Sequence, residues 1–209
     1  MKKHIFILFG IAILLVSCHN LDPKVFDKIS PENYPSNLED INSMITGVYG
    51  DLNRGSYTGL GDISQQSRLI MNTATTDEFY CSWRNNTWKM YEDFTWLPTS
   101  AEVTAKTYIN YTQLISRCVS AIDVLEHTTI PIKDDLRARY IGEMQTIIAM
   151  HIYFLYDFYG PVAVVLDPSI IDDGSSTFVP ERQTKEWTID KINELARAAA
   201  DVLPVHYEN

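Results

Sequence analysis

One stretch limits what this chain can fold into: residues 136–166, whose sequence is LRARYIGEMQTIIAMHIYFLYDFYGPVAVVL. Its apolar residues recur at steps of three and four, as they do on one face of a helix. That row is Leu136, Tyr140, Met144, Ile147, His151, Leu155 and Tyr159. A second row, on another face, is Ile141, Ile148, Ile152 and Tyr156. A helix that is apolar on two faces needs cover on both, so the pattern predicts a central helix between neighbouring helices.

The ends of this central helix are also marked in the sequence. Asp134 or Asp135 can cap its start. Gly160 followed by Pro161 ends it, because glycine accepts the left-handed conformation and proline cannot continue the hydrogen-bond ladder. The next five residues, VAVVL, predict either one short strand or an extended buried run.

Other segments show helical spacing as well. Ser36 and Glu39 have the spacing of a capping box and predict a first helix that ends near Gly55. Residues 62–71 are a weaker helical candidate, and a long helix is predicted from Thr99 to about Leu125. The expected inward residues of the first helix are Leu38, Ile41, Ile45, Val48 and Leu52.

A last helix is predicted between Thr184, which can cap it, and Pro204, which stops it. Its expected inward residues are Ile189, Ile192, Ala196, Ala199 and Leu203. The short connection between the 99–125 helix and the central helix predicts an antiparallel hairpin. The residues therefore predict an all-α fold of antiparallel helical hairpins joined by long irregular loops.

The first 17 residues read as a targeting signal rather than as part of the fold. Lys2 and Lys3 precede about a dozen mostly apolar residues, too few for a membrane-spanning helix, which needs about 20. Residues 15–18, Leu-Val-Ser-Cys, resemble the bacterial lipobox, in which the cysteine is acylated. We therefore predict a lipoprotein signal peptide over 1–17, lipidation of Cys18 and an extended tether over 18–35. The alternative is an ordinary signal peptide with an incidental cysteine.

Charge and cysteine usage narrow the function classes. The formal net charge is −10 at pH 7, which argues against binding nucleic acid or anionic lipid head groups through a basic face. Cys81 and Cys118 could pair in an oxidising envelope, but two cysteines make no metal site or disulfide framework. Separate thiols are favoured, because Cys118 lies on a predicted apolar helix face.

Residues 79–96 hold seven aromatic side chains, including three of the four tryptophans. The intervening residues are polar and turn-forming, and neither a helical nor an alternating period fits, so an irregular loop is predicted. Aromatic rings beside Arg and Asn suit a sugar or peptide site, because rings stack on apolar faces while amides and guanidinium bond hydroxyls or carbonyls. The alternative is that the rings pin a long loop to the core. The candidate ligand contacts are Trp83, Arg84, Trp88, Tyr91 and Trp96.

Signatures of catalysis are missing from the sequence. No Gly-rich phosphate loop, HExxH, CxxC or GxSxG motif occurs. Glu143 and His151 lie about two helical turns apart on the central helix, but a lone histidine on an apolar face is more often a core residue than a ligand. Residues 172–174, Asp-Asp-Gly, favour a plain turn over a calcium loop. We predict no catalytic residue, no metal site and no cofactor.

These features together resemble the N-terminal part of the SusD/RagB family of outer-membrane lipoproteins. The family pattern on the central helix is met by Glu143, Ala149, Tyr153, Phe154, Tyr159 and Gly160. The chain departs from that pattern at Ile148, at Ala163 and around Cys118, as a divergent member would. Residues 36–209 would then form a SusD-like N-terminal helical domain, without the C-terminal part of the family fold.

The resemblance implies a tetratricopeptide-like helical protein, lipid-anchored in the outer membrane of a Bacteroidetes-type envelope and exposed at the cell surface. Such a protein captures oligosaccharide, or sometimes peptide, for a SusC-like TonB-dependent transporter, and is not an enzyme. The rival hypothesis is a helical adaptor lipoprotein that docks on an envelope partner without binding a small ligand. An enzyme acting on glycans, with Glu143 or another carboxylate at its site, is the least favoured hypothesis.

Overall fold

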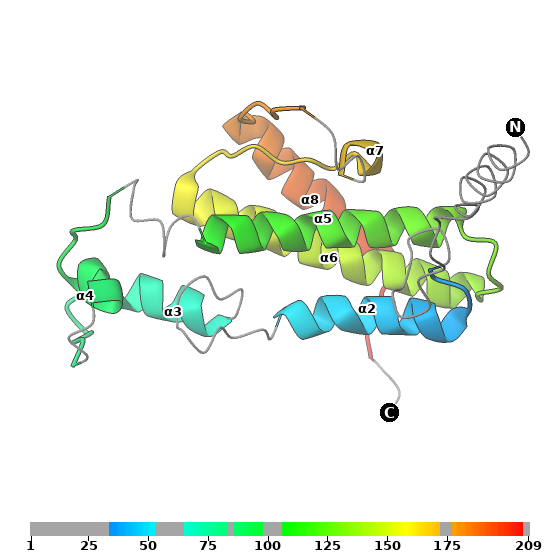
Figure 1. Cartoon of the computed structure of the whole chain (residues 1–209), viewed down its shortest axis with the longest axis horizontal. Coiled ribbons are helices and arrows are strands. Elements are labelled where there is room, and N and C mark those ends of the chain that lie inside the picture. Colours follow the sequence, from blue (N-terminus) through cyan, green and yellow to red (C-terminus); the bar gives the residue numbers. More distant parts are fainter. Residues whose placement is uncertain (1–33, 53–64, 83–85, 98–105, 172–176, 207–209) are drawn as a thin grey trace, which may run out of the picture. The chain divides into compact units, whose positions relative to one another are not determined.

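The computed structural model describes residues 34–52, 65–82, 86–97, 106–171 and 177–206. The predicted signal peptide, Cys18 and nearly all of the predicted tether lie outside these ranges. The regular elements within them are all helices, as predicted, and Ser36–Asn209 forms one compact unit. The helices are α2 (Leu38–Leu52), α3 (Gln65–Ala74), α4 (Asn86–Glu92), α5 (Lys106–His127), α6 (Asp134–Tyr159), α7 (Pro168–Ile171) and α8 (Lys185–Val202) (Figure 1).

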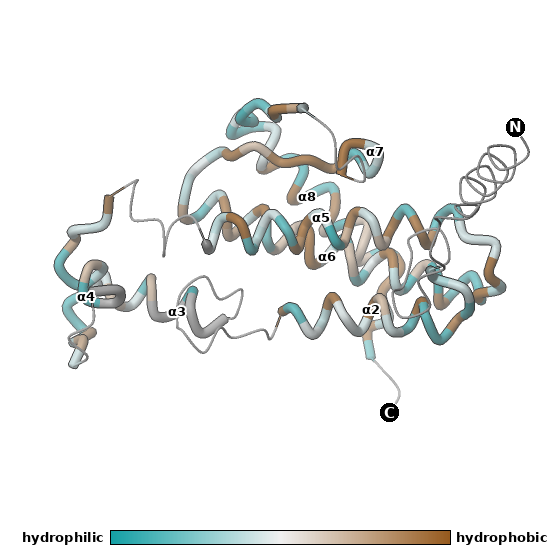
Figure 2. The backbone as a smooth tube through the Cα atoms, viewed as in Figure 1, coloured by the Kyte–Doolittle hydropathy of each residue, from teal (hydrophilic) through white to brown (hydrophobic). Residues whose placement is uncertain are grey.

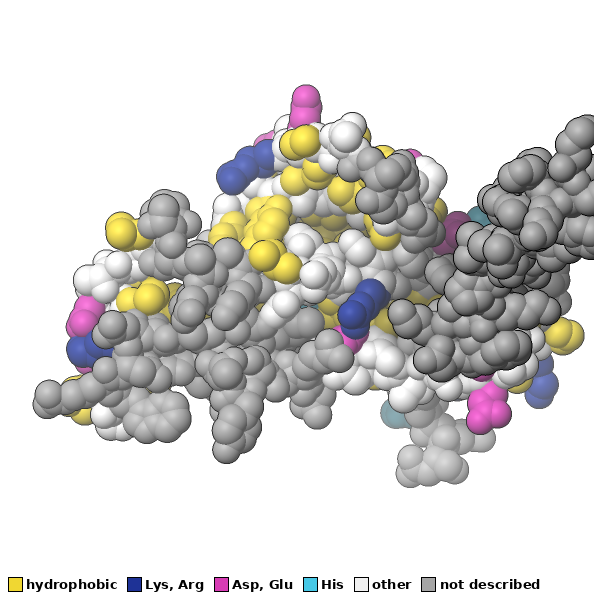
Figure 3. Space-filling view, viewed as in Figure 1, with side chains coloured by type: hydrophobic (Ala, Val, Ile, Leu, Met, Phe, Trp, Pro, Cys, Tyr) yellow, Lys and Arg dark blue, Asp and Glu magenta, His cyan; other side chains and the backbone are white. Residues whose placement is uncertain are grey.

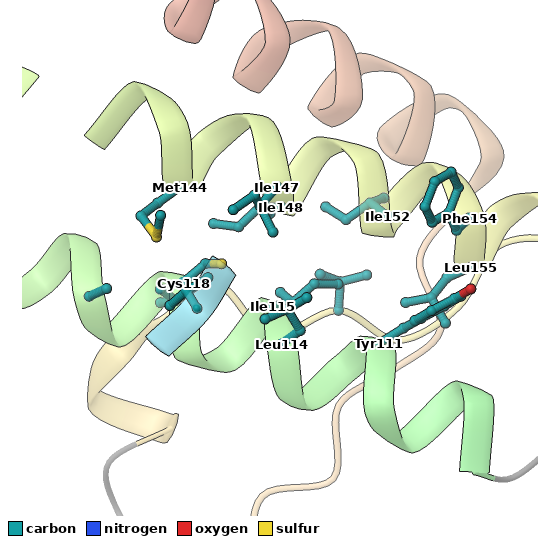
Figure 4. Packing of buried hydrophobic residues seen from close by; sticks show 14 of the residues in the cluster. Tyr111, Leu114, Ile115, Cys118, Met144, Ile147, Ile148, Ile152, Phe154 and Leu155 are labelled. Atoms are coloured by element: carbon teal, nitrogen blue, oxygen red, sulfur yellow. The ribbon is translucent and has the colours of Figure 1, made fainter. Parts of the chain in front are cut away.

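The predicted central helix is α6, and it is covered on two sides. It forms an antiparallel hairpin with α5 and packs against α8 with another face (Figure 1). Side chains of both helices fill the space between α5 and α6 (Figure 4). These include Leu114, Cys118, Met144, Ile148 and Ile152, all at most 2% exposed. The hairpin and the central position of this helix are therefore confirmed.

One end of α6 was predicted correctly and the other was not. Gly160 occupies the C-cap with φ 69°, and its N–H donates to the Tyr156 carbonyl at 2.9 Å. At the start, Lys133 occupies the N-cap and its side chain accepts no backbone N–H, while the Asp135 carboxylate accepts the Leu136 N–H at 2.9 Å. Asp134 and Asp135 instead lie in the first turn, where their negative charge suits the positive end of the helix dipole. A carboxylate can stabilise a helix start from within the first turn, which is why the spacing alone misplaced the cap.

The segment after α6 is extended but forms no strand among the described residues. Val162 and Val164 are buried, while Ala163 and Val165 are half-buried. Its hydropathy is high along most of its length (Figure 2). Within the described part of the chain, its one backbone pairing runs from the Gln183 N–H to the Val162 carbonyl at 3.1 Å. A single hydrogen bond makes no ladder, so the extended buried run is the correct alternative.

The cap of α2 lies one residue later than the predicted capping box. The Asn37 side-chain oxygen accepts the Asp40 N–H at 3.0 Å, and the Asp40 carboxylate accepts the Ser36 N–H at 2.8 Å. The Ser36 hydrogen bonds hold the pKa of Asp40 below its usual value. Of the predicted inward stripe, Ile41, Ile45 and Val48 are buried, Leu52 is half-buried and Leu38 is 37% exposed.

Two polar contacts attach α2 to the hairpin. The Arg117 guanidinium on α5 forms an ion pair with Asp51, which is 5% exposed. The Tyr140 hydroxyl on α6 donates to the Asn42 side-chain oxygen at 2.8 Å. One contact comes from α5 and the other from α6. Together they fix both where α2 lies on the hairpin and how far it lies from it.

The inward face of α8 was predicted only in part. Ala199 and Thr188 are buried and Ile192 is half-buried, but Ile189 is 38% exposed and Ala196 is also exposed. The helix is thus rotated so that Thr188 faces inward. A threonine can occupy this position because its hydroxyl donates to the Thr184 carbonyl at 2.8 Å, within its own helix. The apolar-only pattern overlooked this residue.

Gly142 marks a close approach of α6 and α8. A Cβ atom at this position would lie 2.6 Å from Val202 Cγ2 and 3.3 Å from Leu203 Cγ. The missing side chain lets the C-terminal end of α8 lie directly on α6.

Thr184 caps α8 as predicted, and its removal gives a first test of the fold. Its hydroxyl oxygen accepts the Trp187 N–H at 3.1 Å. We expect Thr184→Ala to lower the free energy of unfolding by about 1 kcal/mol, because one backbone donor of the first turn loses its partner. Urea denaturation measures this change. Thr184→Ser keeps the hydroxyl and should cost less than half as much; an equal loss would contradict the capping role.

Cys81 and Cys118 are both buried and form no disulfide with each other, as favoured from the sequence. Cys118 is fully buried between α5 and α6, and burial raises its thiol pKa to about 12. Cys81 is 7% exposed. Among the described helices, none combines the length and apolar character needed to cross a bilayer.

Candidate functional site

The predicted aromatic segment forms part of a small cavity between α3, the turn after α4 and the C-terminal end of α6. The cavity measures about 150 Å³. Its lining residues are Met71, Asn72, Thr75, Tyr91, Trp96, Phe158 and Tyr159. We call it the aromatic pocket. Rings therefore reach one place from parts of the chain that are far apart in sequence.

A tight turn after α4 brings Trp96 back onto Tyr91. The Phe94 N–H donates to the Tyr91 carbonyl at 3.2 Å, and the Thr95 N–H donates to the Met90 carbonyl at 2.9 Å. Phe94 has φ 54°, a left-handed conformation that non-glycine residues rarely adopt. The Trp96 ring centroid then lies 5.7 Å from that of Tyr91 and 5.6 Å from that of Phe94. Trp96 is 37% exposed, so it can offer part of its surface to a ligand.

Tyr91 forms the floor of the pocket rather than its rim. It is 7% exposed, and its hydroxyl donates to the Met71 sulfur at 3.2 Å. Burial raises the pKa of Tyr91 far above its ordinary value and that of Tyr159 to about 12. Both phenols therefore remain protonated at neutral pH. They contribute rings and neutral hydroxyls to the pocket, without charge.

Two polar side chains, one on α3 and one just after it, complete the wall. Asn72 presents an exposed amide, which can both donate and accept hydrogen bonds. The Thr75 hydroxyl donates to the Asn72 carbonyl at 2.9 Å and keeps a lone pair free to accept. The lining is thus flat rings with neutral hydrogen-bonding groups beside them.

Arg68 holds α3 against the end of α6. Its guanidinium carbon lies 4.4 Å from the Phe154 ring centroid and 5.8 Å from that of Tyr153. Its Nη2 atom is 3.4 Å from an Asp157 carboxylate oxygen. Because Asn72 follows Arg68 by one helical turn, this contact positions the polar wall of the pocket relative to Phe158.

The predicted ligand contacts are placed only in part. Tyr91 and Trp96 come together in the aromatic pocket, while Trp83 and Arg84 lie outside the described residues. Trp88 lies on α4, but its side chain is outside the described part of the chain. The prediction of an irregular loop throughout 79–96 was wrong, because Asn86–Glu92 is helical. A helix of seven residues is too short for its period to stand out in the sequence.

Most of the remaining pocket residues were missed. Nothing in the sequence around Asn72 and Thr75 indicates a binding site. Met71 is only the last residue of the weakly predicted 62–71 helix. Tyr159 was placed on the inward row of α6, and the aromatic run at residues 153–159 could have indicated a second source of rings. Tyr91 fits the hypothesis that the rings pin this segment to the core. For Trp96, contact with a ligand stays a prediction.

His151 is a core residue, as predicted. It is fully buried, its Nδ1 bonds the Ile147 carbonyl at 2.7 Å, and its Nε2 has no hydrogen-bond partner among the described residues. Tyr111 and Phe154 lie edge-on to it, with ring centroids 5.2 and 5.5 Å away. The described residues contain no cluster of His, Cys, Asp or Glu that could hold a metal ion.

Burial of His151 predicts a pH dependence of stability. Burial lowers the pKa of His151, so the folded chain resists a proton that the unfolded chain accepts below about pH 6.5. The contribution is fully present above that pH and falls as the pH drops, by up to about 1.4 kcal/mol per unit. Urea denaturation between pH 7 and pH 5 measures it. His151→Phe should flatten the slope in this window; an unchanged slope would assign it to other groups.

Comparison with solved structures identifies the architecture. A SusD-like carbohydrate-binding protein from Bacteroides vulgatus ATCC 8482 superposes with a TM-score of 0.66 at 11% sequence identity, covering 83% of this chain and 37% of that one. Surface glycan-binding protein A from Bacteroides uniformis gives 0.66 at 17% identity, covering 83% and 36%. A laminarin-binding SusD-like protein gives 0.65 at 16% identity, covering 80% and 34%. The chain has the SusD-like fold.

This SusD-like chain spans little more than a third of the length of those structures. No protein-family model and no curated protein sequence matches it. At identities below 20%, the similarity establishes the fold of the SusD-like chain, including its tetratricopeptide-like helical pairs.

Proposed function

We propose that this SusD-like chain is a surface lipoprotein that binds oligosaccharide and passes it, unchanged, to a SusC-like TonB-dependent transporter of the outer membrane. The aromatic pocket is the observation that carries the proposal. It joins rings with neutral hydrogen-bonding groups, the combination that binds a sugar through its apolar face and its hydroxyls.

Exposed rings extend this surface beyond the pocket. Phe94 is 64% exposed and packs beside Trp96, and Leu97 is 60% exposed. Trp83, Arg84 and Trp88 belong to the same 79–96 segment, and we propose that they complete the ligand contacts. Each stacked ring contributes on the order of 1 kcal/mol, so binding depends on several rings and is weak for a single sugar unit.

Two structural neighbours support a glycan as the ligand, since one is described as carbohydrate-binding and another as laminarin-binding. A peptide ligand is the alternative. The described site holds no metal-binding cluster, and Glu143 faces Arg139, with Nε and Oε1 3.4 Å apart. Because these two neighbours are described by what they bind, we favour a role in holding ligand rather than in transforming it.

The envelope location rests on the sequence and on one neighbour. Residues 15–18 resemble a lipobox, which predicts an acylated cysteine at Cys18 followed by a tether, and a protein of the same fold is described as a surface glycan-binding protein. We propose that Cys18 anchors the chain in the outer membrane with its body exposed at the cell surface. Mass spectrometry of the N-terminal peptide from cells tests this: an unmodified Cys18 would overturn the anchor.

Glycan binding is tested with residues 19–209 and a panel of neutral oligosaccharides that includes laminarin fragments. Isothermal titration calorimetry should give dissociation constants in the micromolar to millimolar range for at least one of them. If none binds while the chain still retains a TonB-dependent transporter from solubilised outer membranes, the adaptor hypothesis is supported instead. If neither binds, the proposal fails.

A further inference from the structure

A second cavity lies away from the aromatic pocket and shares no lining residue with it. It measures about 220 Å³ and is bounded by four elements: α5, α6, α8 and the start of α7. Its floor is aliphatic, formed by Val119, Ile122, Ile148, Leu166, Pro168 and Leu195. We call it the aliphatic groove. Figure 3 shows the face over α5 and the segment between α6 and α7, where hydrophobic side chains reach the surface.

The groove has an acidic rim. Asp123 and Glu126 of α5 line it, and the remaining polar lining residue, Gln145, is neutral. Both carboxylates lie in the last two turns of α5, where the negative end of the helix dipole adds to their potential. The lining itself therefore carries negative charge and no positive charge.

Among the described residues, no lysine or arginine forms an ion pair with Asp123 or Glu126. The Arg137 guanidinium donates to the Leu125 carbonyl at the end of α5. Lys191, one turn before Leu195 on α8, bonds Glu194 at 2.6 Å. His127 Nδ1 lies 3.1 Å from the Asp123 carboxylate and offsets its charge only when the ring is protonated.

We infer that the aliphatic groove binds a polypeptide partner through one bulky aliphatic side chain flanked by lysine or arginine. The aliphatic floor buries the side chain and the two carboxylates meet the flanking cations, which is the complementarity that selects such a segment. Aromatic rings are absent from the lining, which distinguishes this site from one that stacks sugars. The groove takes a single side chain, so the contact is weak and reversible alone.

The inference is independent of glycan binding and has its own test. The full chain, selectively methyl-labelled, is titrated with the peptide acetyl-Gly-Arg-Leu-Arg-Gly-amide and followed by NMR. We expect saturable shifts of the Val119, Ile122 and Leu195 methyl groups with a millimolar dissociation constant. The same peptide with alanine in place of leucine should bind at least tenfold more weakly, and one with glutamate in place of both arginines should not bind measurably.

The rim carboxylates supply the matched variants. Asp123→Asn with Glu126→Gln should weaken the arginine peptide about fivefold, and raising the salt from 50 to 500 mM should do the same to the unaltered chain. Glu186→Gln with Asp190→Asn removes two exposed carboxylates of α8 outside the groove and should leave binding unchanged. Absence of methyl shifts up to 20 mM peptide, or equal binding of the arginine and glutamate peptides, would overturn the inference.

Discussion

Replacing Trp96 by alanine should weaken oligosaccharide binding about tenfold or more while leaving the helical circular dichroism unchanged. Trp96 is the partly exposed ring of the aromatic pocket, and it rests on Tyr91 and Phe94. Its removal takes away one stacking surface and loosens Phe94 beside it. Loss of stacking and of buried ring area together amounts to about 1.5–2 kcal/mol, which corresponds to roughly a 10- to 30-fold change in the dissociation constant. Calorimetry with the tightest-binding oligosaccharide of the panel measures it.

Two variants separate stacking from disturbance of the site. Tyr80→Ala removes a ring that is 79% exposed but does not line the pocket, so it should leave affinity within twofold. Tyr91→Phe keeps the ring of the floor and removes only the hydroxyl that bonds Met71, so it should have a smaller effect than Trp96→Ala. Equal affinity of the Trp96→Ala variant and the unaltered chain would place the glycan elsewhere on the molecule.

Long periodic elements of this chain could be predicted because their signal repeats. The two apolar rows cover most of the 26 residues of α6, and Gly160 has a conformation that few other residues adopt, so the central helix and its end were identifiable. The exact residue at which a helix begins was harder to predict. Ser36 and Asn37 are both good capping residues one position apart, and only the Asn37–Asp40 hydrogen bond of the folded chain distinguishes them.

The sequence indicated which segment holds the candidate site, but not how its side chains are arranged. An excess of aromatic residues marked 79–96, but whether a given ring is floor or rim depends on distant partners. Tyr91 is buried because Met71, from α3, and Phe158, from the end of α6, pack in the same cluster. The local sequence around Tyr91 does not show that these distant residues pack against it. Burial of Thr188 on α8 and of His151 on α6 likewise depends on hydrogen bonds within each helix that let a polar residue leave water.

Replacing Ile152 by alanine should have the largest effect on stability among the substitutions considered. Ile152 is fully buried in the core shared by α5 and α6. Truncation removes its buried methylene and methyl groups and leaves a space that the covered helix cannot close, which costs about 2–5 kcal/mol. For a chain of this size each kcal/mol lowers the melting temperature by about 2–4 °C, so we expect a fall of roughly 10 °C. Thermal and urea denaturation monitored by circular dichroism measure it.

A graded series on the same helix makes this test specific to burial. Ile152→Val removes one methylene and should cost about 0.5–1.5 kcal/mol, between the unaltered chain and the alanine variant. Thr146→Ala changes an exposed residue of α6 whose hydroxyl donates to the Gly142 carbonyl of the same helix, and it should stay within about 0.5 kcal/mol. If Ile152→Ala cost no more than Thr146→Ala, α6 would not be covered closely by its neighbours. The central helix would then lose its place as the element around which the other helices pack.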